Sequence, residues 1–184
     1  MSDNFSNDEN LQARQRLKSF EDSVFLHTPI LLRVATRMCK KSGEADDVVQ
    51  ETLLRAWKYW DSFEQGTNCR AWLFRIMVNV VQRRRETIAA TAEHVSVEEP
   101  TISNVLKFEP KMEFDESGAI AAIEKLPSEY KDVIVLVLVE EFSYKEVSAM
   151  LDIPMGTVMS RLHRARLMIK KMLKPLWGEQ AASI

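Results

Sequence analysis

The residues with the clearest chemical potential lie in positions 156–174, where the chain carries six Lys or Arg residues and no Asp or Glu. At 3.6 residues per turn, the polar residues of this stretch fall on one side of a helix and the apolar residues on the other. Hydroxyl, imidazole and guanidinium groups on one face suit contact with phosphates and base edges. The pattern predicts DNA binding, and the alternative is a basic face that is only solvated. The polar side holds Ser160, His163, Arg164, Lys171 and Lys174, and the apolar side holds Val158, Leu162, Ala165, Ile169, Met172 and Leu173.

The residues just before this stretch carry the signals of a helix-turn-helix. Ser143 and Glu146 stand three apart, as a capping box requires, so a short helix is expected to begin near Tyr144. A break follows at residues 152–156, and Pro154 suits the first turn of a second helix. A capped helix, a break and a basic amphipathic helix in this order favour DNA binding over a solvated surface.

Residues 63–86 (FEQGTNCRAWLFRIMVNVVQRRRE) combine an aromatic ring, an amide and cations on one helical face. Rings and guanidinium groups stack on unstacked bases, and an amide can read a base edge. The face therefore suits single-stranded DNA, with the run of three Arg from Arg83 gripping phosphate. The alternative places Trp72 in the core and leaves the Arg run solvated. The polar face holds Trp72, Arg75, Asn79 and Arg83, and the opposite, packing side holds Leu73, Phe74, Met77, Val80 and Val81.

Residues 44–60 (EADDVVQETLLRAWKYW) predict a helix with a packing stripe and an acidic opposite face. Leu54 lies among the polar residues, and single exposed leucines often have no function. The alternative is a docking face, because an apolar anchor ringed by Asp, Gln and Glu resembles a protein contact, and its acidity excludes DNA as partner. The stripe holds Ala45, Val48, Val49, Thr52, Leu53 and Ala56, and the opposite face holds Asp47, Gln50, Glu51, Leu54 and Lys58.

Composition limits the function classes. The formal net charge of the 184 residues is -2, but charge is segregated: positions 93–116 carry seven acids against two Lys, in contrast to the basic stretch 156–174. The two Cys have no CxxC spacing, no apolar run approaches the roughly 20 residues that span a bilayer, and the N-terminus is acidic. We expect a cytoplasmic protein without membrane insertion, metal or cofactor. The three His are scattered and no phosphate loop or nucleophile motif occurs, so an enzyme is the weakest option.

Patterning predicts an all-α chain of two small helical domains joined by a flexible acidic linker. Its expected parts are a polar N-terminal tail (1–17), a first domain (18–86) with breaks at 42–43 and 63–68, a linker (87–117) and a helix-turn-helix domain (118–184). Residues 133–139 (VIVLVLV) have the propensity of a buried strand. We assign them to a helix, because a helix start precedes them at 126–129 and no second strand is present to pair.

The order of DDVVQETLLRAW, FEQGTNCRAWLFRIMVN, an acidic linker, LPSEYKDVIVL and SYKEVSAMLDIPMGTVMSRLHRAR resembles the extracytoplasmic-function (ECF) class of bacterial RNA polymerase sigma factors, over about residues 20–175. The resemblance implies a promoter-specificity subunit of core RNA polymerase. Its first domain would dock on the beta-prime clamp and open the -10 element. Its second would read the -35 element and meet the beta flap, and the linker would thread the polymerase interior. Relatives are commonly held inactive by an anti-sigma factor.

The resemblance also assigns roles to residues. Asp47, Gln50 and Glu51, with Leu54 beside them, match the clamp-binding helix. Phe63 and Asn79 match positions that form a pocket for a flipped -10 base. Met159 stands where many relatives carry Arg, which favours contact with a thymine methyl. The -35 residues matched by the resemblance are Ser160, Arg161, His163, Arg164 and Arg166.

The predicted -10 set is wider than the resemblance. The helical face of residues 69–86 adds Trp72, Arg75 and Arg83, and the loop before it adds Asn68, although the 67–69 loop varies among relatives.

A second function class fits the same helix-turn-helix. It is a two-domain transcriptional regulator that binds duplex DNA without core polymerase, usually at symmetric sites. Initiation at a defined promoter after addition to core polymerase would distinguish the two.

Overall fold

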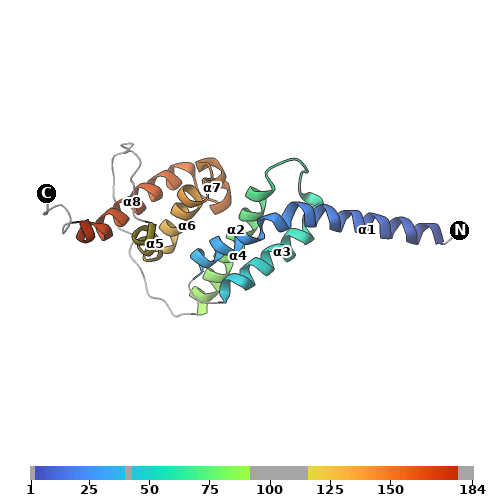
Figure 1. Cartoon of the computed structure of the whole chain (residues 1–184), viewed down its shortest axis with the longest axis horizontal. Coiled ribbons are helices and arrows are strands. Elements are labelled where there is room, and N and C mark those ends of the chain that lie inside the picture. The colour runs from blue at the N-terminus through green and yellow to red at the C-terminus, as the bar shows by residue number, and fades with distance from the viewer. Residues whose placement is uncertain (1–2, 40–42, 92–115, 178–184) are drawn as a thin grey trace. The chain divides into compact units, whose positions relative to one another are not determined.

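The computed structural model describes residues 3–39, 43–91 and 116–177. All regular secondary structure in these ranges is helical, which confirms the predicted all-α class. The chain divides into two compact units, Met1–Arg83 and Arg84–Ile184 (Figure 1). The helices are α1 (Asp3–Val24), the 3-10 turn η1 (Phe25–His27), α2 (Thr28–Met38), α3 (Glu44–Lys58), the 3-10 turn η2 (Trp60–Ser62), α4 (Cys69–Thr91), α5 (Glu116–Glu124), α6 (Ser128–Ile134), the π-helical turn η3 (Val135–Val139), α7 (Tyr144–Leu151) and α8 (Met155–Trp177).

The first helix is longer than expected. Instead of a tail over residues 1–17, α1 begins at Asp3, and Figure 1 shows it continuing past α2, α3 and α4 toward the N-terminus. No Pro or Gly interrupts its sequence, and Gln, Arg, Leu and Lys are good helix formers. A break that was not predicted separates α1 from α2. It lies at η1, and Pro29 at the start of α2 explains it, because proline fits the first turn of a helix but not its interior.

The core of the first unit follows the predicted packing stripes. Ala45, Val48, Val49, Thr52 and Ala56 of α3 are buried, whereas Leu53 is half-buried. The Thr52 hydroxyl donates to the Val48 carbonyl oxygen at 2.7 Å, so its burial leaves no unsatisfied donor. All five residues predicted for the packing side of α4 are buried as well. The opposite faces of both helices are therefore presented outward.

The helix-turn-helix forms as predicted. The Ser143 Oγ accepts from the Glu146 backbone N–H at 3.3 Å, and the Glu146 carboxylate accepts from the Ser143 N–H at 2.9 Å, so the capping box is complete. The first helix, α7, begins at Tyr144 and is closed by Asp152 in the left-handed conformation (φ 53°). The second helix, α8, begins directly after Pro154.

The assignment of residues 133–139 to a helix rather than a strand is confirmed. Helix α6 runs to Ile134 and continues into the π-helical turn η3. Residues 133–136 are buried, and α6 packs against α8. An apolar run of this kind can therefore be a helix that is covered on most sides. Hydrophobic periodicity alone does not distinguish such a helix from a buried strand.

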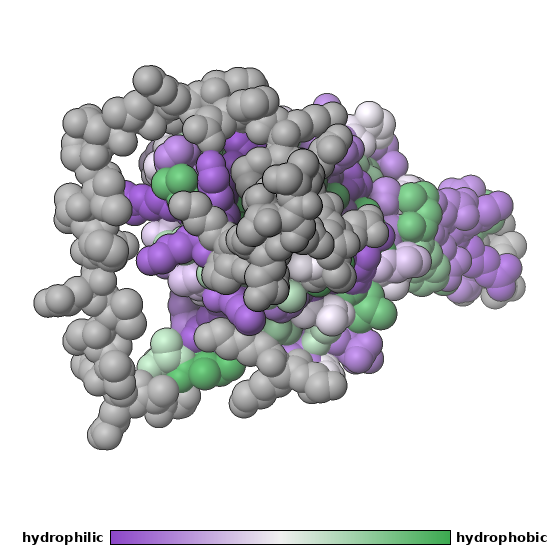
Figure 2. Space-filling view, turned by 60° about the vertical axis from the view of Figure 1, so that its left-hand side comes forward, coloured by the Kyte–Doolittle hydropathy of each residue, from purple (hydrophilic) through white to green (hydrophobic). Residues whose placement is uncertain are grey.

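The predicted linker lies mostly outside the described residues. Helix α4 extends into it as far as Thr91, and α5 begins at Glu116. In the described part of the chain, no helix is both long and apolar enough to cross a membrane. In Figure 2 the visible described surface is mainly hydrophilic, with hydrophobic residues in small separate patches.

Candidate functional site

The outward face of α3 carries the predicted docking residues. Asp47 and Gln50 are exposed, and Leu54 is the most exposed large hydrophobic residue of the described chain, at 70%. Glu51 is half-buried and accepts from Arg55 Nε at 3.0 Å and from Arg55 Nη2 at 2.6 Å. All four predicted residues thus lie away from the core stripe, and one carboxylate is held in place by a neighbouring cation.

A groove of about 440 Å³ runs beside this face. It is almost entirely apolar, and the only polar side chain in its lining is Gln50. An apolar groove next to exposed acids suits the apolar and basic side chains of a protein partner. The sequence interpretation missed the part of the lining that comes from α1 and η1, because it began the first domain at residue 18 and did not foresee the turn at 25–27. The lining residues are Leu17, Phe20, Phe25, Gln50, Leu53, Leu54 and Trp57.

The outward face of α4 carries the second predicted set. Arg75, Asn79 and Arg83 are exposed, and Trp72 is half-buried. Asn68 is exposed, and its side-chain oxygen accepts from the Ala71 N–H at 3.0 Å, so this residue caps the start of α4. The face offers one ring, one amide and two guanidinium groups on successive turns.

The aromatic residues next to this face pack against one another. Phe63 is only 8% exposed, and its ring centroid lies 5.0 Å from Trp72 and 5.1 Å from Trp60. Trp60 is buried and lies 6.0 Å from Trp72. The alternative that Trp72 is a core residue is therefore partly right, because one side of its ring packs inward. Phe63 can shape a pocket from beneath, but it does not present a free ring face.

The predicted -35 residues all lie on α8. Ser160 is exposed, and its hydroxyl donates to the Thr157 carbonyl oxygen at 3.1 Å. Val158, Leu162, Ala165, Ile169 and Leu173 are buried, as the helical period predicts. The half-buried members of the predicted set are Met159, Arg161, His163, Arg164 and Arg166.

Two titratable groups flank the start of α4. Burial raises the pKa of the Cys69 thiol, which donates to the Ser23 carbonyl oxygen at 3.6 Å, so the thiol stays protonated at neutral pH. Burial, and secondarily the Arg70 guanidinium, lower the pKa of His27. Neither group adds charge at neutral pH, so arginine supplies the positive charge of this region.

Comparison with known proteins shows that two family models match the chain, one in each part. Residues 25–89 match Sigma-70 region 2, and residues 119–169 match Sigma-70, region 4. The chain is 35% identical over 164 residues to the ECF RNA polymerase sigma factor EcfG of Rhodopseudomonas palustris, covering 84% of this chain and 85% of that protein. It is 31% identical over 169 residues to SigW of Bacillus subtilis, covering 86% and 90%.

A solved structure is similar over nearly the whole of its own chain. It is the sigma factor RpoE in complex with the anti-sigma factor NepR from Bartonella quintana, with a TM-score of 0.64, 31% identity, and coverage of 85% of this chain and 98% of that one. Helices α3 and most of α4 fall inside the region 2 match, and the first part of α8 falls inside the region 4 match.

Proposed function

The chain belongs to the ECF family of RNA polymerase sigma factors, and from this premise we propose which of its surfaces carry out each step of initiation. A sigma factor directs core polymerase to specific promoters and promotes opening of the -10 element. The first domain (18–86) serves polymerase docking and -10 capture, the linker spans 87–117, and the second domain (118–184) reads the -35 element.

The docking surface is the outward face of α3 together with the apolar groove beside it. Leu54 is the anchor, because it is a large apolar side chain that is exposed to solvent in the free protein. Asp47, Gln50 and Glu51 form the polar rim and face the beta-prime clamp. The acidic rim steers a basic partner surface and fixes its register.

The -10 surface is the outward face of α4. Asn79 pairs with the edge of an unstacked base, Arg75 and Arg83 hold phosphates, and the exposed part of the Trp72 ring stacks. Phe63 lies beneath this surface, and Asn68 fixes the first turn of the helix.

The -35 surface is the outward face of α8 in the helix-turn-helix. Arg161, Arg164 and Arg166 supply guanidinium groups for guanine edges and phosphates, His163 and Ser160 supply further donors, and Met159 meets a thymine methyl. Family membership disfavours the alternative of a regulator that acts on duplex DNA without polymerase.

Other partners and the setting follow from the family. The beta flap of polymerase contacts the second domain, and an anti-sigma factor holds the chain inactive. The similar protein RpoE has been solved in complex with the anti-sigma factor NepR, which supports a partner of this kind. The chain acts in the cytoplasm and has no catalytic activity of its own, since RNA synthesis belongs to the polymerase. A stoichiometric protein that copurifies under non-inducing conditions would support this control.

One observation carries the proposal: a single small unit presents two separate outward faces, an acidic-apolar one on α3 and a ring-amide-guanidinium one on α4. One face suits protein and the other suits unpaired bases. A protein that must bind polymerase and captured DNA strand together needs both.

The test is the substitution Asn79→Ala, measured by permanganate footprinting with core polymerase on a linear promoter and on a template already melted across the -10 element. We expect a loss of about 1–3 kcal/mol in open-complex formation on duplex DNA. Pre-melting should restore part of the loss, because the cost of unpairing is already met. Gln12→Ala, which removes an exposed amide from α1, is the control. Normal opening of the linear promoter by Asn79→Ala would refute the -10 assignment.

A further inference from the structure

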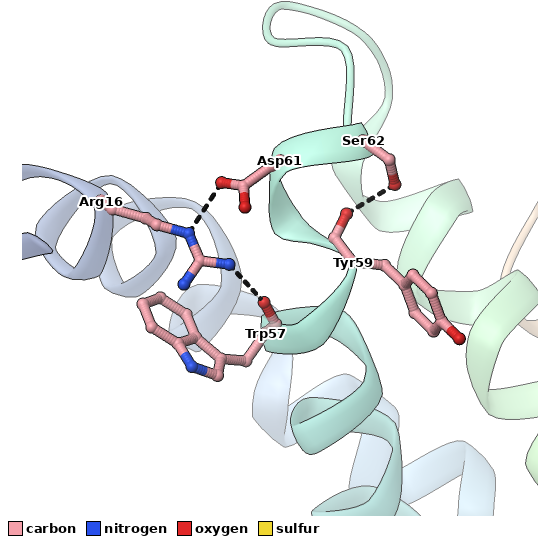
Figure 3. A network of polar contacts seen from close by, with 5 residues as sticks. All are labelled: Arg16, Trp57, Tyr59, Asp61 and Ser62. Atoms are coloured by element: carbon pink, nitrogen blue, oxygen red, sulfur yellow. Dashed lines mark hydrogen bonds and ion pairs between the residues drawn. The ribbon is translucent and has the colours of Figure 1, made fainter.

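Arg16 of α1 makes two contacts with the last turn of α3 and one with the following 3-10 turn η2 (Figure 3). Its Nε donates to the Asp61 carboxylate at 2.7 Å, and its Nη2 donates to the Trp57 carbonyl oxygen at 2.9 Å. Its guanidinium carbon lies 4.0 Å from the centroid of the Trp57 ring. Residues far apart in sequence are thereby joined at the point where α3 gives way to the turn η2.

The ion pair alone does not explain this arrangement. Asp61 is 74% exposed, and a pair of this kind contributes little in water. The Trp57 carbonyl, however, is one of the last four of α3, which have no i+4 amide donor within the helix and carry its negative dipole end. The N–H of the C-cap residue Tyr59 also points at this carbonyl, and Arg16 adds a charged donor from another helix. A planar guanidinium can satisfy that carbonyl, reach Asp61 and stack on the Trp57 ring at once, which the point charge of a lysine cannot do.

The turn η2, which Arg16 contacts, leads directly into the aromatic cluster next to the proposed -10 surface. Trp60 of η2 stacks on Phe63 with an angle of 20° between rings, and both lie against Trp72 of α4. Phe20, one helical turn after Arg16 on α1, packs on Trp60 with centroids 5.3 Å apart. Helix α1 therefore contacts the turn η2 and the end of α3 through an apolar residue, Phe20, and a polar one, Arg16.

The hydrogen bonds inside the turn are local ones. Ser62 donates through its hydroxyl to the Tyr59 carbonyl oxygen at 2.6 Å (Figure 3). In the loop that follows the turn, the Thr67 hydroxyl donates in the same way to the Glu64 carbonyl oxygen at 2.7 Å. Local bonds shape a turn but do not fix it against the rest of the domain. The two Arg16 bonds span 41 and 45 residues and do fix it.

We propose that Arg16 is a positioning residue for -10 recognition: it fixes the turn at residues 59–62 against α1. It thereby sets the placement of Trp60 and Phe63 beneath the base-reading face of α4 and of Trp72 on that face. Arg16 itself touches no DNA. The inference rests on the proposed -10 surface and adds a supporting residue to it. This residue lies outside the segment matched to Sigma-70 region 2, which begins at position 25.

The expected size follows from population arithmetic. Apparent affinity falls in proportion to the fraction of molecules whose site is correctly formed. If loss of the three contacts leaves the turn correctly placed in about a tenth to a third of molecules, affinity for the -10 strand falls about 3- to 10-fold. Core binding should change much less, because every groove side chain is retained and only Trp57 among them loses a contact with Arg16.

The experiment compares holoenzymes made with wild-type chain, Arg16→Ala and Arg16→Lys. The probe is a fluorescent single strand of the -10 element from a promoter selected in vitro with wild-type holoenzyme, together with strands changed at single -10 positions. We expect Arg16→Ala to bind the cognate strand about 3- to 10-fold more weakly and to discriminate less among the changed strands. Arg16→Lys should restore less than half of the loss, whereas Arg14→Ala, an equal charge loss on the exposed side of α1, should behave as wild type.

Three results would overturn the inference: normal strand binding by Arg16→Ala, full rescue by Arg16→Lys, or an equal loss of affinity for core polymerase, which would assign Arg16 to the docking groove. Asn79→Ala is measured beside these variants. If Asn79→Ala binds the strand normally, the proposed -10 surface fails. If Asn79→Ala is defective and Arg16→Ala is normal, only the role of Arg16 fails.

Discussion

Truncation of Leu54 isolates the docking step from folding. The side chain is 70% exposed in the free protein and lies opposite the core stripe of α3. Leu54→Ala therefore removes apolar surface that the fold does not use, and alanine is at least as good a helix former as leucine. We expect the melting temperature and helicity to stay close to those of the wild type.

The loss on binding can be worked from the exposed fraction. Full burial of a leucine side chain is worth about 1.5–3 kcal/mol, and 70% of that surface remains to be covered by the partner. The available energy is therefore about 1–2 kcal/mol, which corresponds to a dissociation constant for core polymerase about 5- to 30-fold higher. Adding Gln50→Ala, at the edge of the same groove, should increase the loss.

The assay is a fluorescence titration of labelled chain with core polymerase. Leu11→Ala is the matched control, since Leu11 lies on α1, is 55% exposed and does not line the groove. Equal affinities for Leu54→Ala and wild type would refute the docking assignment. A loss shared by Leu11→Ala would show that exposed leucines of this domain act nonspecifically.

Two further predictions concern the second domain. Arg164→Ala should reduce transcription from a cognate promoter by about 1–3 kcal/mol and relax preference at one or two -35 positions, as seen by comparing cognate with scrambled -35 sequences. Lys171→Ala should act less and without sequence preference. Ser143→Ala should cost about 1 kcal/mol by removing the capping oxygen of α7, which lowers the melting temperature of a small domain by about 4–8 °C in a thermal scan, whereas Ser143→Thr should retain most of the stability.

The elements that sequence alone predicted well are those in which several local signals agree. Ser143, Glu146 and Pro154 each constrain the backbone through a specific hydrogen bond or a fixed φ, so the predicted starts of α7 and α8 were correct to within a couple of residues. Periodicity predicted the outward faces of α3, α4 and α8, because a helix that buries one stripe must expose the other.

The features that sequence did not predict depend on contacts between distant residues. Arg16 lies in a polar stretch that reads as a tail, and only the proximity of Trp57 and Asp61 gives it a role. Phe63 illustrates the same limit, since a resemblance can match its position to a base pocket but cannot tell whether its ring faces solvent. Its burial between Trp60 and Trp72 is a tertiary property.

Burial also distinguishes the residues proposed to contact DNA from the residues that support them in the core. Asn79 and Arg75 are exposed, so their truncation should change binding with little effect on stability, as for most surface substitutions. Phe63 is buried, so its truncation creates a cavity and destabilises the domain whether or not it affects a base. Loss of activity in a Phe63→Ala variant is therefore weak evidence for base contact. Loss in Asn79→Ala at unchanged stability is strong evidence, because the fold does not depend on that amide.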